Sequence, residues 1–322
     1  MTRVTFQDQT VDVQQDQTLL DALLDAGFEI PNSCRAGTCQ SCLMQVVEGE
    51  VPALAQKGLK PAQVVQNYFF PCRTYPETDL VVASNPEVSE ATGVVTAKDM
   101  LNHNVLRLWL KADIEFQPGQ FVELKRADGV ARAYSIANTP NNDNLLEFHV
   151  RVYEQGVFSR WLADECEIGA PLRLMGPMGE CFYVADEASN DAPMLLAGTG
   201  TGLAPLLGIA KDALAKGHCG DIKLFVGAKD PSSLYGIAEL EALAQAYPHF
   251  TYTPVVLEAS ESDGAYVMGD INAVIAERVS DCKGYKVFLC GSEQRVNKLR
   301  RDCFMRGASM KDISCDAFTP KA

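Results

Sequence analysis

Alternating apolar residues open the chain, and a helical pattern follows them. Apolar side chains alternate with polar ones on both sides of Asp8-Gln9, which predicts a hairpin of two strands over residues 2–13. Thr18 is a suitable N-cap for a helix ending at Gly27, and the leucines between them keep to one helix face: Leu19, Leu20, Leu23 and Leu24. Apolar runs at 44–47 and 80–82 predict two further strands. The first 84 residues are therefore predicted to form a small mixed α+β domain.

Residues 94–187 have the pattern of an antiparallel β domain. Apolar residues concentrate at 106–110, 120–124 and 145–152, and turn signals such as Pro118-Gly119 separate these strands. The spacing favours an antiparallel β-barrel. Before it, residues 84–93 are polar and contain Pro86 and Gly93, which indicates a linker.

The last third of the chain alternates apolar runs with helical segments. Runs at 193–197, 222–229 and 286–292 have the character of buried strands. Alternating strands and helices predict a parallel sheet of the α/β class. Because 322 residues correspond to two or three domains, we expect a multidomain chain with domains at 1–84, 93–188 and 189–322 and a linker at 85–92.

Four cysteines provide the clearest chemical signal. Cys34, Cys39 and Cys42 have C-x4-C-x2-C spacing, and Cys72 follows after a longer interval. This is the plant-type arrangement that holds a 2Fe-2S cluster through four cysteinates. The residues between the ligands are small or conformationally permissive, so the loop can wrap the cluster and aim N–H groups at its sulfurs: Ala36, Gly37, Thr38 and Ser41.

Two other uses of these cysteines are open. A four-cysteine zinc site usually pairs two short C-x2-C hooks, and this chain has one. Disulfides require an oxidising compartment. The N-terminus shows no signal peptide, and no run approaches the roughly 18 apolar residues of a spanning helix. We therefore expect a cytoplasmic protein that does not enter membranes.

Charge narrows the range of partners. The net charge is −14, and residues 1–92 hold 12 acidic and 5 basic side chains. An acidic surface repels phosphate backbones, so nucleic acid is not expected to bind. The acidic first domain could steer docking onto a basic patch of a redox partner, or it could serve solubility alone.

Several short motifs follow the cysteine loop in a fixed order. Each is ordinary by itself: an arginine beside a tyrosine is common on a surface strand, and Gly-x-x-Ser is common before a helix. In chain order the motifs are Arg132-x-Tyr134-Ser135, His149-Val150-Arg151, Gly156-Val157-Phe158-Ser159, the glycine turn Gly198-Thr199-Gly200-Thr201-Gly202 with Pro205 after it, and Cys290-Gly291. A glycine turn between strand and helix lets a pyrophosphate approach the backbone and the helix N-terminus.

The cysteine loop closely resembles that of plant-type ferredoxins, which implies a β-grasp fold. The later motifs, in this order, resemble the ferredoxin–NAD(P) reductase superfamily, which implies a barrel that binds FAD and a Rossmann-like domain that binds NAD(P)H. The resemblance implies that Arg132 clamps the flavin diphosphate, that Tyr134 packs on the isoalloxazine ring and that Ser135 lies near flavin N5. It extends the flavin site to Ile136, His149, Val150, Arg151 and residues 156–159. Gln155 departs from the pattern, because a glycine often precedes Gly156 in the family.

The same resemblance assigns the nucleotide residues. Gly198, Thr199, Gly200, Thr201, Gly202 and Pro205 would receive the nucleotide diphosphate, and Gly227, Lys229, Cys290 and Gly291 would complete the site. Cys290 would lie beside the nicotinamide, or it is simply a buried small hydrophobic residue. Phe318 would cover the flavin face and Asp316 would place a charge near hydride transfer; a frayed terminus is the alternative. One lysine beside Asp230 favours NADH over NADPH, since a 2′-phosphate would require a cluster of cations.

Across the whole chain, this layout is similar to the reductase components of bacterial ring-hydroxylating aromatic oxygenases, such as benzoate dioxygenase reductase. It implies a relay from NADH to FAD to the 2Fe-2S cluster and on to a terminal oxygenase, with the cluster at about −400 mV. Two alternatives are a relay to a non-oxygenase partner, such as a deoxysugar-forming dehydratase, and a non-catalytic redox sensor. A sensor would be expected to lack the nucleotide turn.

Overall fold

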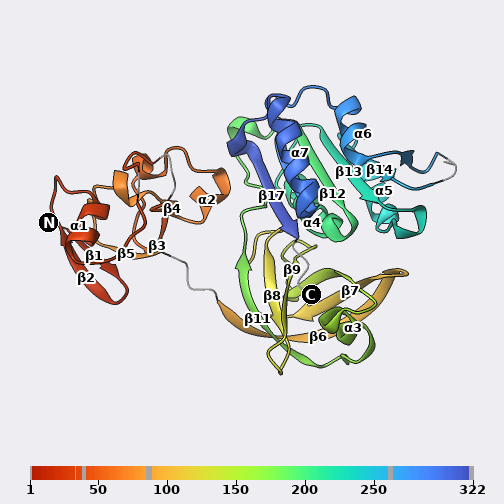
Figure 1. Cartoon of the computed structure of the whole chain (residues 1–322), viewed down its shortest axis with the longest axis horizontal. Helices are drawn as coiled ribbons and strands as arrows, with labels where there is room; N and C mark the ends of the chain where they lie inside the picture. Colours follow the sequence, from red (N-terminus) through yellow and green to blue (C-terminus); the bar gives the residue numbers. More distant parts are fainter. Residues whose placement is uncertain (1, 33, 38–40, 85–88, 260–263, 319–322) are drawn as a thin grey trace. The chain divides into compact units, whose positions relative to one another are not determined.

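The computed structural model describes residues 2–32, 34–37, 41–84, 89–259 and 264–318 (Figure 1). The chain divides into two compact units, residues 1–87 and 88–322. Each unit has its own buried core, and the two are described separately below.

The first unit is a five-stranded mixed sheet packed against a helix. The strands are β1 (Thr2–Phe6), β2 (Gln9–Val13), β3 (Met44–Glu48), β4 (Tyr68–Phe69) and β5 (Leu80–Ala83), in the spatial order β2-β1-β5-β3-β4. The helices are α1 (Leu19–Asp25) and α2 (Pro61–Val65), with 3₁₀ turns η1 (Ala53–Gln56) and η2 (Pro71–Arg73). The predicted hairpin, helix and two strands are confirmed, whereas the short α2 and β4 were not predicted.

Local sequence explains the hairpin and the helix. Gln7 and Asp8 both have positive φ, as a two-residue turn between antiparallel strands requires. The Thr18 hydroxyl accepts a hydrogen bond from the Asp21 amide at 3.1 Å and caps α1. Gly27, with a φ of 90°, ends the helix as predicted.

The second unit begins with an antiparallel barrel. Its strands are β6 (Glu90–Asn102), β7 (Val105–Lys111), β8 (Phe121–Lys125), β9 (Ala131–Ser135), β10 (Leu145–Arg151) and β11 (Pro171–Met178), and helix α3 (Val157–Asp164) follows β10. The order is β10-β7-β6-β11-β8-β9, and a bridge between Ile136 and Phe148 joins the two edges. The predicted antiparallel barrel is therefore confirmed.

The start of β6 corrects one detail of the sequence pattern. Glu90, Ala91 and Thr92 fall in the stretch expected to be linker, yet they pair with β11. Glu90 and Thr92 are exposed, which explains why the start of this strand has no apolar pattern. Residues 85–88 of the expected linker lie outside the described residues.

A parallel sheet completes the second unit. Its strands are β12 (Met194–Thr199), β13 (Ile222–Ala228), β14 (Phe250–Val256), β15 (Val267–Met268), β16 (Lys286–Ser292) and β17 (Ile313–Phe318), in the order β15-β14-β13-β12-β16-β17. The helices are α4 (Leu203–Ala215), α5 (Ile237–Ala246), α6 (Ile271–Arg278) and α7 (Glu293–Met305), with 3₁₀ turns η3 (Glu187–Ser189), η4 (Gly200–Gly202), η5 (Pro231–Ser233) and η6 (Met310–Asp312). The predicted α/β domain is confirmed.

Two cores cover the two faces of the parallel sheet. One contains α4 and α5 residues such as Leu206 and Leu240, and the other contains α6 and α7 residues such as Ile275 and Leu299 (Figure 1). Helices on both faces explain why the central strands are almost wholly apolar. The carboxyl ends of the strands therefore meet at one edge, where ligands bind in such sheets.

Close backbone approaches fix the turn after β12. A Cβ on Gly202 would lie 2.4 Å from the Cys290 carbonyl oxygen, so the turn and β16 come within contact distance only because residue 202 is glycine. Gly200 has positive φ but open space around it.

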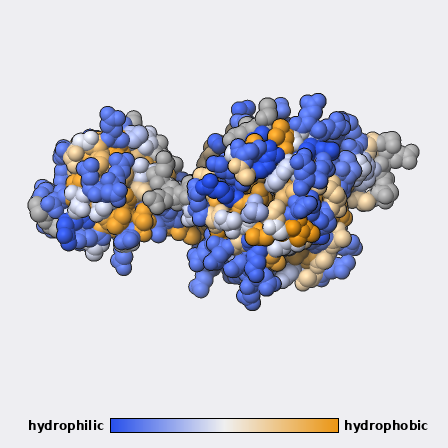
Figure 2. All heavy atoms as spheres, turned by 90° about the horizontal axis from the view of Figure 1, so that it is seen from below, coloured by the Kyte–Doolittle hydropathy of each residue, from blue (hydrophilic) through white to orange (hydrophobic). Residues whose placement is uncertain are grey.

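Most of the visible surface of each unit is hydrophilic, with small hydrophobic patches between the polar areas (Figure 2). Among the described residues, no helix is both long and apolar enough to cross a lipid bilayer.

Gly202→Ala is expected to destabilise the second unit more than Gly200→Ala does. The first change forces the turn away from β16, at about 1–3 kcal/mol, whereas the second costs about 1 kcal/mol through backbone strain alone. Thermal unfolding of both variants measures the difference. A Gly202→Ala variant as stable as Gly200→Ala would contradict the close packing.

Candidate cofactor sites

The cysteine loop of the first unit has donors suited to an iron–sulfur cluster. The Ala36 amide donates a hydrogen bond to Cys34 Sγ at 3.3 Å, which is the contact that stabilises a thiolate ligand. Arg35 and Gly37 both have positive φ, so the loop curls tightly. A Cβ on Gly37 would lie 2.7 Å from Arg73 Cδ, which packs this loop against the segment that carries Cys72.

The predicted ligands differ in exposure. Cys34 is exposed, while Cys42 and Cys72 are buried in the core of the first unit. Cys39 lies outside the described residues, and within the described part of the chain no three Cys, His, Asp or Glu side chains gather closely enough to hold a metal ion. Thiolate donors with a backbone N–H aimed at sulfur fit a 2Fe-2S cluster.

A cavity of about 720 Å³ lies in the second unit, with walls from the barrel, the start of α3 and the last strand. Nearly all the residues predicted for the flavin line it. They are Arg132, Tyr134, Ser135, His149, Arg151, Gly156, Val157, Phe158, Ser159, Asp316 and Phe318. The size is in the range of cavities that enclose a large organic ligand.

Ser135 and Asp316 join the two halves of this cavity. The Ser135 hydroxyl donates a hydrogen bond to Asp316 Oδ2 at 2.7 Å, across 181 residues of sequence. Burial raises the pKa of the Asp316 carboxyl, and the hydrogen bond from Ser135 offsets only part of this effect. Asp316 and Phe318 belong to β17, which pairs with β16, so the chain end is a strand and the alternative of a frayed terminus is wrong for residues up to 318.

Aromatic and cationic groups form the remaining walls. Tyr134 packs near Phe158, with ring centroids 6.0 Å apart, and burial raises the pKa of the Tyr134 phenol. Arg132 and Arg151 bring two permanent positive charges to the cavity. This combination of a flat apolar wall and guanidinium groups suits a flavin ring attached to a diphosphate.

The start of α3 depends on Gly156. A Cβ at this position would lie 2.3 Å from Ser159 Oγ, so any larger residue would displace the serine. The Ser159 hydroxyl accepts a hydrogen bond from the Tyr153 amide at 3.3 Å and holds the approach to the helix. Gln155, which departs from the family pattern, also lines the cavity.

A second cavity of about 250 Å³ adjoins the first at the carboxyl edge of the parallel sheet. Thr199, Gly200, Thr201, Gly227 and Lys229 line it, as predicted for the nucleotide. Four residues line both cavities: Arg151, Tyr153, Thr201 and Phe318. Ligands in the two cavities would therefore meet at a common wall.

Two of the cations that line the smaller cavity, Lys229 and Arg295, are already paired with carboxylates. Lys229 Nζ lies 3.6 Å from Glu258 Oε2, and Arg295 Nη1 lies 2.7 Å from Asp270 Oδ2. Backbone geometry holds the first pair together, because the Glu258 amide donates to the Lys229 carbonyl oxygen at 2.7 Å.

Seven predicted residues lie behind the cavity walls among the residues described. Ile136 and Val150 point into the barrel core and are fully buried. Cys290 is also buried, with its Sγ 3.7 Å from Cys181 Sγ. The others shape the turn and strand ends next to the smaller cavity: Gly198, Gly202, Pro205 and Gly291.

Other cavity residues were not assigned to the sites from the sequence. Phe121, Ala133, Tyr153, Ala204 and Ala317 line the larger cavity, and Ser233, Val255, Leu257, Gly269, Ile271, Ser292 and Arg295 line the smaller one. Arg295 could have been found as the basic residue in the first turn of the helix after Cys290-Gly291. The rest reach the cavities through long-range packing.

Three domain models match consecutive parts of the chain. Residues 3–77 match the 2Fe-2S iron-sulfur cluster binding domain, residues 92–183 the oxidoreductase FAD-binding domain, and residues 195–300 the oxidoreductase NAD-binding domain. An aromatic O-demethylase reductase subunit of Amycolatopsis sp. is 33% identical, over 96% of each chain. The chain belongs to the three-domain 2Fe-2S flavoprotein reductases.

Further relatives have the same layout as this reductase. The ferredoxin–NAD(P)(+) reductase component of the naphthalene 1,2-dioxygenase system of Pseudomonas putida is 30% identical over 94% of this chain and 93% of its own. A CDP-6-deoxy-L-threo-D-glycero-4-hexulose-3-dehydrase reductase of Yersinia pestis is 28% identical, over 94% and 93%. The crystal structure of an Amycolatopsis cytochrome P450 reductase superposes with a TM-score of 0.70 at 32% identity, covering 99% of both chains.

The reductase is an NADH-dependent oxidoreductase whose cofactors are FAD and a 2Fe-2S cluster. The predicted fold, cofactors and enzyme class are thereby confirmed. The two adjoining cavities fit the two nucleotide cofactors, and the cysteine loop fits the cluster.

Asp316 is expected to make stability depend on pH. Because the folded pKa of Asp316 is raised, its carboxyl destabilises the fold progressively as pH rises from the ordinary carboxyl value of about 4 through the folded value. Asp316→Asn should remove this loss. Thermal unfolding of both proteins from acid to neutral pH measures it, and a melting-temperature difference that does not change with pH would contradict the raised pKa.

Proposed function

We propose that this reductase passes electrons from NADH, through FAD and its 2Fe-2S cluster, to the terminal oxygenase of a multicomponent oxygenase. The observation that carries the proposal is the pair of adjoining cavities with common walls, in a chain that also holds a plant-type cysteine loop. When bound, FAD supplies the conversion of a two-electron hydride into the single electrons that a 2Fe-2S cluster carries.

The roles of individual residues follow from their place in the cavities. We propose that Arg132, Arg151 and the N-terminus of α3 hold the flavin diphosphate, since they combine guanidinium charge with free backbone N–H groups. Tyr134 and Phe318 provide flat walls for the ring. Ser135 and Asp316 form the polar pair beside the reacting atoms, with the serine hydroxyl fixed toward the carboxylate.

The turn after β12 would receive the nucleotide. Thr199, Gly200 and Thr201 present backbone at the smaller cavity, at the start of a long buried helix. Cys290 would act as a support behind this wall, since its thiol is buried against Cys181. Cys34, Cys39, Cys42 and Cys72 would hold the cluster.

We also propose the domain limits 1–84, 90–188 and 189–322 and a cytoplasmic location; the barrel domain starts at residue 90 rather than 93 because Glu90–Thr92 belong to β6. The location is supported by buried cysteines such as Cys166, Cys282 and Cys303, which form no disulfide. The acidic excess of the first domain would direct it toward a basic surface on its protein partner.

A non-oxygenase acceptor is the second candidate. It is favoured by the similarity to a dehydrase reductase from Yersinia pestis, since that relative has the same layout. Purified reductase mixed with candidate acceptors distinguishes the two. Product formation coupled to NADH consumption with an oxygenase component supports the proposal, and coupling only to a dehydratase would replace it. A non-catalytic sensor is disfavoured by the intact nucleotide cavity.

Cys72→Ser is expected to separate the two halves of the relay. Without one cluster ligand, NADH-dependent reduction of cytochrome c, a one-electron protein acceptor, should fall by more than about tenfold. Reduction of ferricyanide directly by the flavin should remain within about twofold, because Cys72 lies in the first unit.

Cys219→Ser is the matched control, since Cys219 is exposed in the second unit. Both activities should be unchanged. Equal loss of both acceptor activities in Cys72→Ser, or none, would contradict the assignment of the cluster as the exit for electrons.

Paired cations in the smaller cavity predict a preference for NADH. A 2′-phosphate at the end of β13 would have to compete with Glu258 for Lys229 and with Asp270 for Arg295. Glu258→Gln should therefore raise kcat/KM for NADPH about three- to fivefold, in line with an exposed ion pair, and leave NADH nearly unchanged.

Asp270→Asn should act in the same direction while it preserves the cap of α6, because asparagine is also an effective N-cap. Steady-state rates with both nucleotides measure the preference. If neither variant gains activity with NADPH, the carboxylates do not set the specificity.

A further inference from the structure

A short segment ties the parallel-sheet domain to the barrel within the second unit. Residues 230–236, between β13 and α5, are here named the β13–α5 segment. The Asn102 side-chain amide donates to the Ser233 carbonyl oxygen at 3.1 Å, and His103 Nδ1 lies 3.2 Å from the Ser232 carbonyl oxygen. Asn102 is the last residue of β6 and His103 follows it in the turn to β7, so the barrel holds this segment at two successive residues.

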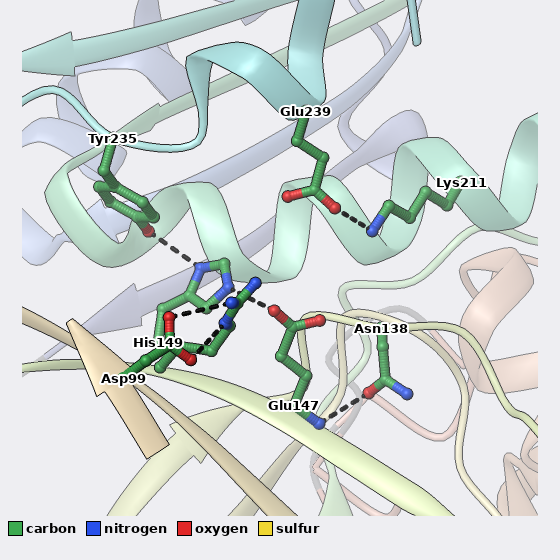
Figure 3. Close-up of polar contacts among 8 residues, drawn as sticks. Asp99, Asn138, Glu147, His149, Lys211, Tyr235 and Glu239 are labelled. Atoms are coloured by element: carbon green, nitrogen blue, oxygen red, sulfur yellow. Dashed lines mark hydrogen bonds and ion pairs between the residues drawn. The ribbon is translucent and has the colours of Figure 1, made fainter. Parts of the chain in front are cut away.

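Tyr235 makes a third contact, which is buried. Its hydroxyl lies 3.2 Å from His149 Nδ1, and the two rings are nearly perpendicular with centroids 5.3 Å apart. On the other side of the imidazole, His149 Nε2 lies 3.1 Å from Glu147 Oε1. Figure 3 shows His149 between Tyr235 and Glu147, with the tyrosine reaching the barrel from the other domain. All three residues are buried.

The direction of the hydrogen bonds follows from burial. Burial raises the pKa of the Tyr235 phenol well above its ordinary value, with the charges of Glu239 and Glu147 adding to the effect. Tyr235 therefore keeps its proton and can donate it to Nδ1, and with that tautomer the Nε2–H of His149 donates to Glu147. The asparagine amide of Asn138 fixes Glu147 in turn, because Asn138 Oδ1 accepts from the Glu147 amide at 2.9 Å.

Two ion pairs lie near this network. Lys211 of α4 forms one with Glu239 of α5 (Figure 3), and Arg107 of β7 forms the other with Asp99 at 2.9 Å. Arg151, on the same strand as His149, also acts on the Tyr235 phenol. The two ion pairs thus give Lys211, Glu239, Arg107 and Asp99 partners outside the Tyr235–His149 hydrogen bond.

The two ends of the network reach the two cavities. His149 lines the larger cavity, while Lys229 and Ser233, beside and within the β13–α5 segment, line the smaller one. A ligand in the smaller cavity that orders the β13–α5 segment would therefore also hold Tyr235 in place. The Tyr235–His149 hydrogen bond in turn positions His149 in the wall of the larger cavity.

We propose that the Tyr235–His149 hydrogen bond couples nucleotide binding in the smaller cavity to FAD binding in the larger one, with both residues as positioning residues for hydride transfer. The inference rests on the proposed function, which assigns the cavities to these ligands. By linkage, FAD must tighten NAD⁺ binding by the same factor as NAD⁺ tightens FAD binding.

The chain contains a matched control for this bond. The Tyr183 hydroxyl lies 3.3 Å from His218 Nδ1, with centroids 5.6 Å apart and rings again nearly perpendicular. Both residues are buried, and neither lines a described cavity. Tyr183→Phe therefore removes the same chemical group from the same kind of contact, away from the cavities.

The experiment measures the dissociation constant of NAD⁺ by calorimetry for the intact chain with and without FAD, together with the rate of flavin reduction at saturating NADH. Loss of one buried hydrogen bond corresponds to about a fivefold effect. Tyr235→Phe is expected to lower both the coupling factor and the reduction rate by about three- to tenfold. Tyr183→Phe should leave both within twofold of wild type, whatever it does to the melting temperature.

The inference is overturned if Tyr235→Phe retains wild-type coupling and rate, or if Tyr183→Phe lowers both equally. A second pair of variants, at His149, tests the same hydrogen bond in case Tyr235→Phe does not fold. His149→Asn keeps an amide near Nδ1 for the Tyr235 hydroxyl and should retain most of the coupling, whereas His149→Leu should lose it; equal coupling in these two also overturns the inference. A wild-type protein that binds neither ligand would instead contradict the proposed function.

Discussion

Hydride transfer requires two flat ring systems to come within contact distance, and this requirement constrains the second unit more than any other. The barrel and the parallel sheet meet this requirement by sharing walls between two cavities. The hydrogen bond from Ser135 to Asp316 lies at this junction, with one residue from β9 and the other from the last strand of the chain. The packing of the barrel and of the parallel sheet holds β9 and β17 in the positions that this hydrogen bond requires.

Several features serve this junction although they do not line the cavities. Gly202 allows the nucleotide turn to touch the end of β16, and β16 in turn carries β17 with Asp316 and Phe318. On the opposite side, the β13–α5 segment is held to the barrel by hydrogen bonds at Ser232, Ser233 and Tyr235. The two cavities are thus fixed to each other by contacts after an inner strand, β13, and along an edge strand, β17.

Sequence reasoning succeeded where the signal is local. The cysteine spacing, the Arg132-x-Tyr134-Ser135 motif and the glycine turn after β12 each depend on a few adjacent residues, and alternation identified most strands. Alternation did not identify β17. Ile313 is the one fully buried residue of this edge strand, so the strand has no run of apolar residues. Residues such as Glu258 and Tyr235 could not be placed, because their partners lie far away in the chain on other elements.

The central claim is that NADH electrons leave this protein one at a time through the cluster. An anaerobic titration of the purified protein with NADH, followed by visible absorption and by EPR of the product, tests it most directly. The account predicts bleaching of both flavin and cluster absorption and the EPR signal of a reduced 2Fe-2S cluster. A flavin that is reduced while no reduced-cluster signal develops would contradict it, because the one-electron exit would then be absent.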